Sequence, residues 1–148
     1  MVQVHVARLA ADGWQHLLLR RRDDDQQYPG LWQCITGTVC DGETMLAAAH
    51  RELSEEVRLN VLQWWALPVI GMFYDRARDA LEIPVAFGAV VSSDAEPTLS
   101  EHAEHRWLAL DAAFATLVVP AHREGTRMFE HVLTDSRRED YERLYRLS

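Results

Sequence analysis

The chain has 148 residues, of which 48% are hydrophobic and 26% charged, values typical of a folded domain in water. Its net charge of −8 argues against a nucleic-acid polymer as a partner, because proteins that bind nucleic acid usually carry a basic surface. Two cysteines make no disulfide framework, no run of 18 apolar residues exists, and the N-terminus lacks a signal-peptide pattern, so we expect one domain over residues 1–148, no membrane span and a cytoplasmic location.

The first expected elements are strands. Valines at every second position of residues 2–6 predict a half-buried strand, and a turn signal at 11–13 separates it from a second strand over 14–20. A short strand over 31–36 then runs directly into Gly37. We therefore expect a hairpin followed by a strand that opens into a loop.

Two places near these strands are candidate contacts for a phosphate chain. Arg21 and Arg22 lie at the end of the second strand, and guanidinium groups pair well with phosphate oxygens. The alternative for both is a solvated strand end balanced by the aspartates that follow. Thr36 is either an ordinary strand residue or a contact to metal or phosphate, and Gly37 lets the chain pass close to such a group.

The central feature is an acidic helix that begins near Thr44, a plausible N-cap residue. At helical spacing one stripe of apolar residues faces a core, and three glutamates share the opposite side. The stripe is Leu46, Ala49, Leu53 and Val57, and the glutamates are Glu52, Glu55 and Glu56. Like charges this close repel each other, which a divalent cation would relieve. The alternative is a solvated acidic face that is salt-bridged to Arg51.

The spacing of Gly37–Leu59 resembles the Nudix box, the signature of the Nudix hydrolase family. That box reads G-x5-E-x7-R-E-U-x-E-E-x-G-U, with U an aliphatic residue, and eight of its nine specified positions are met here. The exception is Arg58, which stands where the family has a glycine that ends the helix. We expect Asn60 to take the left-handed conformation instead. The run LWQ-x-ITG-x-V also resembles one branch of the family, the bacterial dihydroneopterin triphosphate pyrophosphohydrolases.

The resemblance implies an α/β fold, an α/β/α sandwich with a mixed central sheet. It implies that Glu52 and Glu56 bind Mg²⁺, or Mn²⁺ in its place, and that Glu55 shares the site as a ligand or as the general base. Arg51 is then expected to orient the glutamates by salt bridges, one of them to Glu43. The catalytic set implied is Glu52, Glu55 and Arg51. The chemistry and placement of the residues themselves suggest Arg21, Thr36 and Gly37 as the substrate-binding set.

Downstream of the helix the sequence predicts more strands. Residues 61–74 suggest two strands with a break near Pro68, residues 75–79 a charged hairpin tip, and residues 81–91 one continuous strand buried on both faces. Residues 92–100 have no periodicity, which is typical of a loop.

The segment after this loop holds candidate ligands. By the resemblance, a further metal-binding glutamate comes from downstream of the box, and Glu101 is the first candidate and Glu104 the second. Exposed loop carboxylates are the alternative. His102 and His105 form an HxxH pair, which is a weak indication of zinc.

The remaining features concern helices and aromatic residues. Asp111 resembles the N-cap of a short helix over 112–117, and Pro120 precedes a helix that runs to Leu133. A stripe of Tyr141, Leu144 and Tyr145 either docks on the core or makes a dimer contact, so we expect a monomer or a homodimer. Trp64 and Trp65 are expected to point to opposite faces, one into the core and the other toward a pocket, and the alternative for either is an ordinary core or surface residue.

The implied function is a Mg²⁺-dependent pyrophosphohydrolase that acts on a small phosphate substrate. It would cleave a nucleotide-like triphosphate, either dihydroneopterin triphosphate or a (deoxy)nucleoside triphosphate, to a monophosphate and pyrophosphate. One alternative is hydrolysis of nucleoside diphosphates linked to a sugar or another group. Another is a ligand sensor without activity, although such a protein would usually lose box glutamates. A third is an acidic helix that binds a basic protein without needing Mg²⁺.

Overall fold

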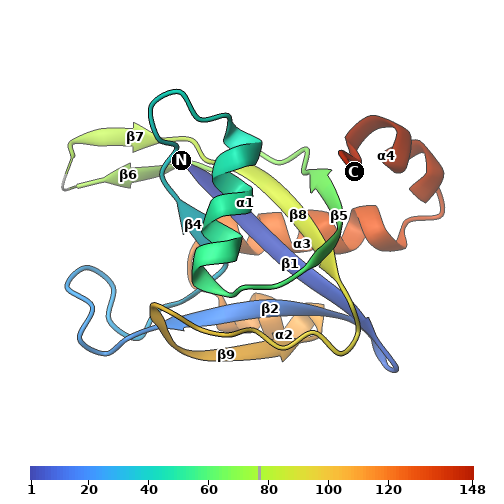
Figure 1. Cartoon of the computed structure of the whole chain (residues 1–148), viewed down its shortest axis with the longest axis horizontal. Helices are drawn as coiled ribbons and strands as arrows, with labels where there is room; N and C mark the ends of the chain where they lie inside the picture. Colours follow the sequence, from blue (N-terminus) through green and yellow to red (C-terminus); the bar gives the residue numbers. More distant parts are fainter. Residues whose placement is uncertain (77) are drawn as a thin grey trace.

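A mixed β-sheet between helices forms the fold in the computed structural model, which describes residues 1–76 and 78–148 (Figure 1). The strands are β1 Val2–Ala10, β2 Gly13–Arg21, β3 Trp32–Gln33, β4 Ile35–Gly37, β5 Val61–Ala66, β6 Phe73–Asp75, β7 Ala80–Glu82, β8 Val85–Val91 and β9 His102–Leu108. The helices are α1 Met45–Glu56, α2 Leu110–Thr116, α3 Pro120–Thr134 and α4 Arg138–Tyr145. Among the described residues, β6 and β7 pair in a hairpin and the other strands form one sheet around β1.

The sheet divides at its centre, and this division creates the place for the site. β1 is antiparallel to β2 only near their common turn, where Ala7 lies opposite His16. Toward the start of β1 the two strands separate, and β4 pairs with β1 while β3 pairs with β2. On the other side of β1 lies β8, which runs parallel to it. The segment 32–37 therefore fills the gap between β1 and β2.

Helices cover both faces of the sheet, so the predicted α/β/α sandwich with a mixed central sheet is confirmed. In Figure 1, α1 lies in front of the sheet and α3 behind it. The valines of β1 pack in one core with Ala49 and Leu53 of α1, whereas Ala7 packs in a second core with Phe129 of α3. Alternate residues of β1 point to opposite layers, as expected for a strand. His5 accordingly meets Thr126 of α3, with its Nδ1 3.1 Å from Oγ1.

The local sequence explains both ends of α1. Thr44 is the N-cap, and its hydroxyl accepts a hydrogen bond from the Ala47 amide at 3.1 Å, as predicted. At the other end the expectation for Asn60 was wrong, because Arg58 itself adopts the left-handed conformation with φ 54°. The Arg58 amide donates to the Leu53 carbonyl at 3.2 Å. The turn therefore forms without glycine, and Arg58 carries its strain.

The elements after α1 match the predictions in some places and differ in others. The single strand predicted over 81–91 is wrong, because the chain leaves β7 before Pro84 and enters the sheet only at Val85, from which point it is buried as expected. The helix near Asp111 begins at Leu110 with Ala109 as its N-cap, so Asp111 lies in the first turn rather than capping it. The break near Pro68 is present, between β5 and β6. Of the predicted hairpin tip, residue 77 lies outside the described residues.

The two neighbouring tryptophans are both core residues. Trp64 packs in the core under α1 and Trp65 in the core under α3, so they point to opposite faces as predicted, and neither lines the pocket that contains Thr36. Tyr141 and Tyr145 of α4 pack against the second core, while Leu144 is exposed. No helix within the described ranges has the length and apolar character needed to cross a membrane.

Candidate active site

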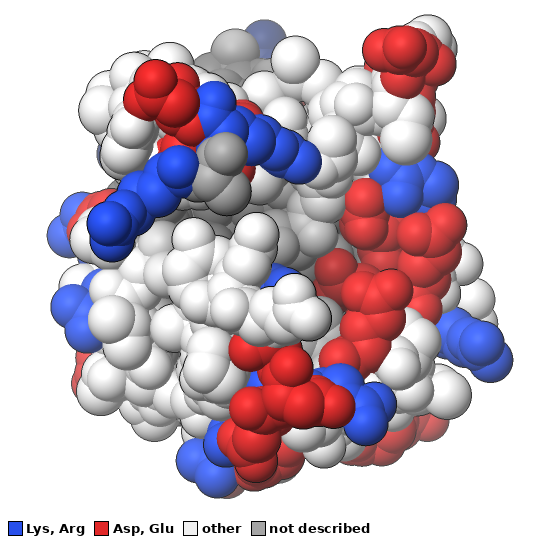
Figure 2. Space-filling model, turned by 90° about the vertical axis from the view of Figure 1, so that its left-hand side faces the viewer, with Lys and Arg blue, Asp and Glu red and all other residues white. Residues whose placement is uncertain are grey.

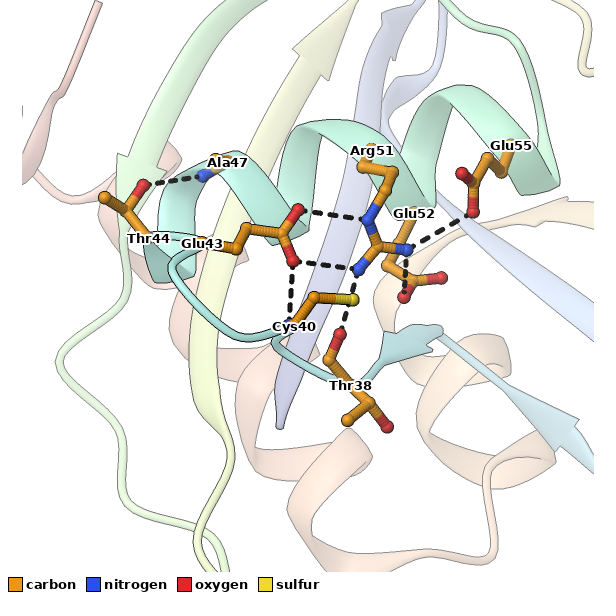
Figure 3. A network of polar contacts seen from close by, with 8 residues as sticks. All are labelled: Thr38, Cys40, Glu43, Thr44, Ala47, Arg51, Glu52 and Glu55. Atoms are coloured by element: carbon orange, nitrogen blue, oxygen red, sulfur yellow. Dashed lines mark hydrogen bonds and ion pairs between the residues drawn. The ribbon is translucent and has the colours of Figure 1, made fainter.

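Arg51 joins the loop before α1 to the glutamates of the helix (Figure 3). Its guanidinium donates to both carboxylate oxygens of Glu43, from Nε at 3.0 Å and from Nη2 at 3.1 Å. Nη1 donates to Glu52 at 2.7 Å and to Glu55 at 3.3 Å, and Nη2 also reaches the Thr38 carbonyl at 2.9 Å. Glu43 in turn accepts from the Cys40 amide at 3.0 Å. The expected salt bridges of Arg51 are confirmed, and they hold the loop on the helix.

Glu52 is positioned by close contact with a glycine. A Cβ atom placed on Gly37 would lie 2.0 Å from Glu52 Cδ, so any larger residue at that position would displace the carboxylate. Gly37 ends β4, which packs beside α1. This packing explains in physical terms why the motif begins with glycine.

Glu56 is the most unusual of the glutamates because it is buried, with 5% of its surface exposed. Burial, followed by the negative charges of Glu52 and Glu101, raises its pKa to about 8. His102 Nδ1 lies 3.6 Å from Glu56 Oε2. Burial and the positive charge of Arg21 lower the pKa of His102 to about 4. Both groups are therefore neutral near pH 7 in the metal-free protein, and their contact is not an ion pair.

The other candidate ligands occupy distinct surroundings. The Glu55 side chain is 59% exposed, so it faces solvent beside Arg51. Glu101 immediately precedes β9 and is close enough to Glu56 to raise its pKa. Glu104 instead pairs with Arg106 at 2.9 Å. The structure thus brings Glu101, and not Glu104, toward the glutamates of α1.

The three residues predicted to bind substrate line one pocket of about 440 Å³. Arg21, Thr36 and Gly37 lie in its wall, and Arg22 does not. Arg21 is held by Asp25 at 2.9 Å and by Gln33 at 3.3 Å. Figure 2 views the molecule from the left-hand side of Figure 1, so the face that carries α1 lies at the right of the picture. Acidic side chains gather on that right-hand side. Gly37 lies in the pocket wall and also against Glu52, so the pocket adjoins the acidic cluster.

Sequence patterns missed several polar residues of this site. Gln33 connects Arg21 to His102, with its Nε2 3.2 Å from His102 Nε2. Gln3 and His122 are buried in the pocket wall. The sequence signal that could have identified Gln3 is its position as a polar residue within an apolar strand. The HxxH pair is not a zinc site, because His102 faces Glu56 whereas His105 faces Glu96 at 3.2 Å.

The donor set fits a hard divalent cation. Glu56 Oε2 is buried without a hydrogen-bond partner among the described residues, and three further carboxylates surround it. Magnesium prefers such oxygen ligands and completes its shell with water and phosphate. Within residues 1–76 and 78–148, no three acidic, histidine or cysteine side chains already converge as ligands, and Arg51 holds one oxygen of Glu52. The cluster supplies the right atoms, with Arg51 neutralising part of their charge.

Comparison with known protein families gives a match over most of the chain. The sequence model described as NUDIX domain matches residues 1–129. The dihydroneopterin triphosphate diphosphatase of Escherichia coli K12 is 44% identical over 61 residues, which make up 41% of this chain and 38% of that protein. The aligned part thus spans about two fifths of that relative's length. The corresponding Haemophilus influenzae protein is 49% identical over 45 residues, 30% of this chain and 26% of that protein.

Solved structures agree with the fold. The structure of the E. coli dihydroneopterin triphosphate pyrophosphohydrolase superposes with a TM-score of 0.72 at 28% identity, covering 86% of this chain and 93% of that one. A NUDIX hydrolase from Listeria monocytogenes superposes with a TM-score of 0.77 at 21% identity, covering 90% of this chain and 93% of that one. The second similarity concerns the fold alone.

Proposed function

The chain belongs to the NUDIX family, and on that basis we propose that it is a Mg²⁺-dependent pyrophosphohydrolase. The proposed reaction is attack of water on a phosphorus of a nucleotide-like triphosphate, which yields a monophosphate and pyrophosphate. The observation that carries this proposal is the buried carboxylate of Glu56, surrounded by other negative charges and without a hydrogen-bond partner among the described residues. A carboxylate in this position is stable only with a proton or a cation.

Each residue of the cluster has a proposed role. Glu52 and Glu56 would hold the cation, with Glu101 as a further ligand. A cation held there would neutralise charge on the phosphates and make the attacking water more acidic. Glu55 is exposed to solvent, which suits either a ligand or the base that accepts the proton of the attacking water. Arg51 positions the glutamates rather than contacting substrate, because its donors are engaged by Glu43, Glu52 and Thr38.

The phosphate chain would lie where the pocket meets this cluster. Thr36 and Gly37 offer backbone at that point, and Arg21 offers a cation that is 28% exposed and already oriented by Asp25. Since the aligned relatives are named for dihydroneopterin triphosphate, that compound is the first candidate substrate. A (deoxy)nucleoside triphosphate is the second.

A substrate panel tests the proposal. Purified protein is incubated with Mg²⁺ and dihydroneopterin triphosphate, common nucleoside triphosphates or linked diphosphates, and phosphate is measured with and without added pyrophosphatase. We expect phosphate only when pyrophosphatase is present, and we expect this activity to collapse in Glu52→Gln and Glu56→Gln. Glu104→Gln, a glutamate paired with Arg106 away from the cluster, is the matched control.

Other results would contradict the proposal in distinct ways. Turnover of linked diphosphates alone, without release of pyrophosphate, would favour the alternative substrate class. Absence of turnover with both Mg²⁺ and Mn²⁺ across the panel would favour a ligand sensor.

A further inference from the structure

Gln3 carries a buried side-chain amide in β1. Its residue is 1% exposed in β1, and neither Nε2 nor Oε1 has a hydrogen-bond partner among the described residues. Buried amides are normally paired, because an unpaired donor or acceptor has lost its bonds to water without replacement. An amide kept in this state points to a partner that residues 1–76 and 78–148 do not supply.

The surroundings of Gln3 are those of a binding site. Gln3 lies in the wall of the 440 Å³ pocket with His122, whose Nδ1 also has no partner among the described residues. Phe73, Tyr74 and Tyr28 contribute aromatic surface to the same pocket. Ligand pockets of this size typically combine apolar walls with a few polar groups that fix orientation. The pocket therefore suits a flat, polar ring.

Two consecutive residues connect Gln3 to the carboxylate cluster. Thr36 of β4 lies directly opposite Gln3 of β1, so their side chains share the α3 face of the sheet. The next residue, Gly37, lies against Glu52 on the α1 side. A ligand whose ring contacts Gln3 would therefore have only this short segment between its ring and the metal-binding glutamates.

We propose that Gln3 selects the ring of the substrate by pairing with its edge. The amide donates from Nε2 and accepts at Oε1, so it complements a ring edge that carries an N–H donor beside an acceptor. Pterin and guanine rings offer this pair as a lactam, and adenine offers it as an amino group beside a ring nitrogen. This assignment rests on the proposed function for the position of the phosphate chain.

Ring binding is tested without turnover. Neopterin, guanosine and adenosine are titrated into metal-free protein by NMR, each beside a form methylated on its edge nitrogen: 3-methylneopterin, 1-methylguanosine and N6,N6-dimethyladenosine. We expect the wild-type protein to bind the intact form of at least one ring at least about fivefold more tightly, the lower end for a bidentate amide pair. The ring that shows the preference identifies the edge that Gln3 reads.

Gln3→Met removes the hydrogen-bonding groups at similar volume, and we expect it to abolish the preference. The matched control is Gln63→Met, because Gln63 is a half-buried glutamine of β5 that also has an unpartnered Oε1 among the described residues but does not line the pocket. This control should keep the preference. We also expect Gln3→Met to raise the melting temperature of the free protein, since it removes an unpaired buried amide.

Three results would overturn the role of Gln3. They are a wild-type protein that binds every intact and methylated pair equally, a preference that persists in Gln3→Met, and a melting temperature that falls in Gln3→Met. Absence of pyrophosphate release together with an intact, Gln3-dependent ring preference would instead contradict the proposed reaction. The two proposals can therefore fail separately.

Discussion

Arg58 stands where the family pattern has glycine, and its backbone adopts the conformation that glycine favours. A non-glycine residue at positive φ destabilises the fold by roughly 1–2 kcal/mol. Replacing it with glycine removes this strain but costs roughly 0.5–1 kcal/mol, because glycine loses more conformational entropy on folding. We expect Arg58→Gly to raise the free energy of unfolding by about 0.5–1 kcal/mol in urea titrations. Asn60→Gly should lower it, because Asn60 has no positive φ. Equal effects of the two substitutions would contradict this explanation.

Glu56 makes the stability of the metal-free protein depend on pH. Its pKa is 4.5 when unperturbed and about 8 in the fold, so between these values the folded protein keeps a proton that the unfolded chain has released. The stability contribution of this group is therefore complete below pH 4.5 and is lost as pH rises through 8.

Glu56→Gln removes this dependence. We expect the free energy of unfolding of the mutant, minus that of the wild-type protein, to grow between about pH 5 and about pH 8 in urea titrations with EDTA. His102 contributes with the opposite sign, since its lowered pKa stabilises the fold above its ordinary pKa of 6.5 and less as pH falls toward 4. Because both proteins retain His102, the comparison isolates Glu56. A constant difference would show that Glu56 is ionised in the folded protein.

At the scale of elements, Arg51 anchors the loop before α1 through Glu43 and the Thr38 carbonyl. Glu43→Gln keeps the size of the side chain but removes the charge that both Nε and Nη2 of Arg51 contact. We expect kcat to fall about tenfold to a hundredfold, because small displacements of catalytic groups have effects of this size. Steady-state kinetics with the substrate found in the panel, and a circular dichroism spectrum to confirm folding, would measure it. An unchanged kcat would mean that the loop needs no anchor on Arg51.

The elements that the sequence predicted well are those set by local signals. Thr44 caps α1 and the apolar stripe through Leu53 sets its buried face, because both depend on residues within a few positions. The sequence did not predict the break between β7 and β8, because β-forming residues continue up to Pro84. These residues are exposed because pairing with β1 begins only at Val85, and the local sequence does not determine this starting point. Leu81 and Ile83 remain largely exposed although their sequence resembles a core strand.

At the scale of the whole molecule, metal binding should stabilise the fold. A ligand that binds only the folded state at a hundred times its Kd adds about 2.7 kcal/mol to the free energy of unfolding. We expect Mg²⁺ to raise the melting temperature of the wild-type protein and of Glu104→Gln, and EDTA to reverse the increase. Glu52→Gln and Glu56→Gln should respond weakly. An equal response in all four proteins would place the cation elsewhere.

The site as a whole was only partly predictable. The glutamates of α1 and Gly37 belong to one continuous sequence motif, so the sequence alone predicted that they lie together. Gln3 and His122 are far apart in sequence and meet in one pocket only through the pairing of β1 with β4 and the packing of α3 behind them. Contacts of this kind depend on tertiary structure, which no local pattern encodes.

The division of the sheet between β1 and β2 has a consequence for how such a protein can diversify. Residues 36 and 37 of β4 lie between two groups of residues. The glutamates lie on the α1 side of the sheet, and the polar pocket wall that contains Gln3 lies on the α3 side. With the roles proposed above, substitutions on the α3 layer would exchange one substrate for another and leave the proposed reaction centre intact. Under these proposed roles the two layers would be separable, so that specificity could be redesigned on the α3 layer alone.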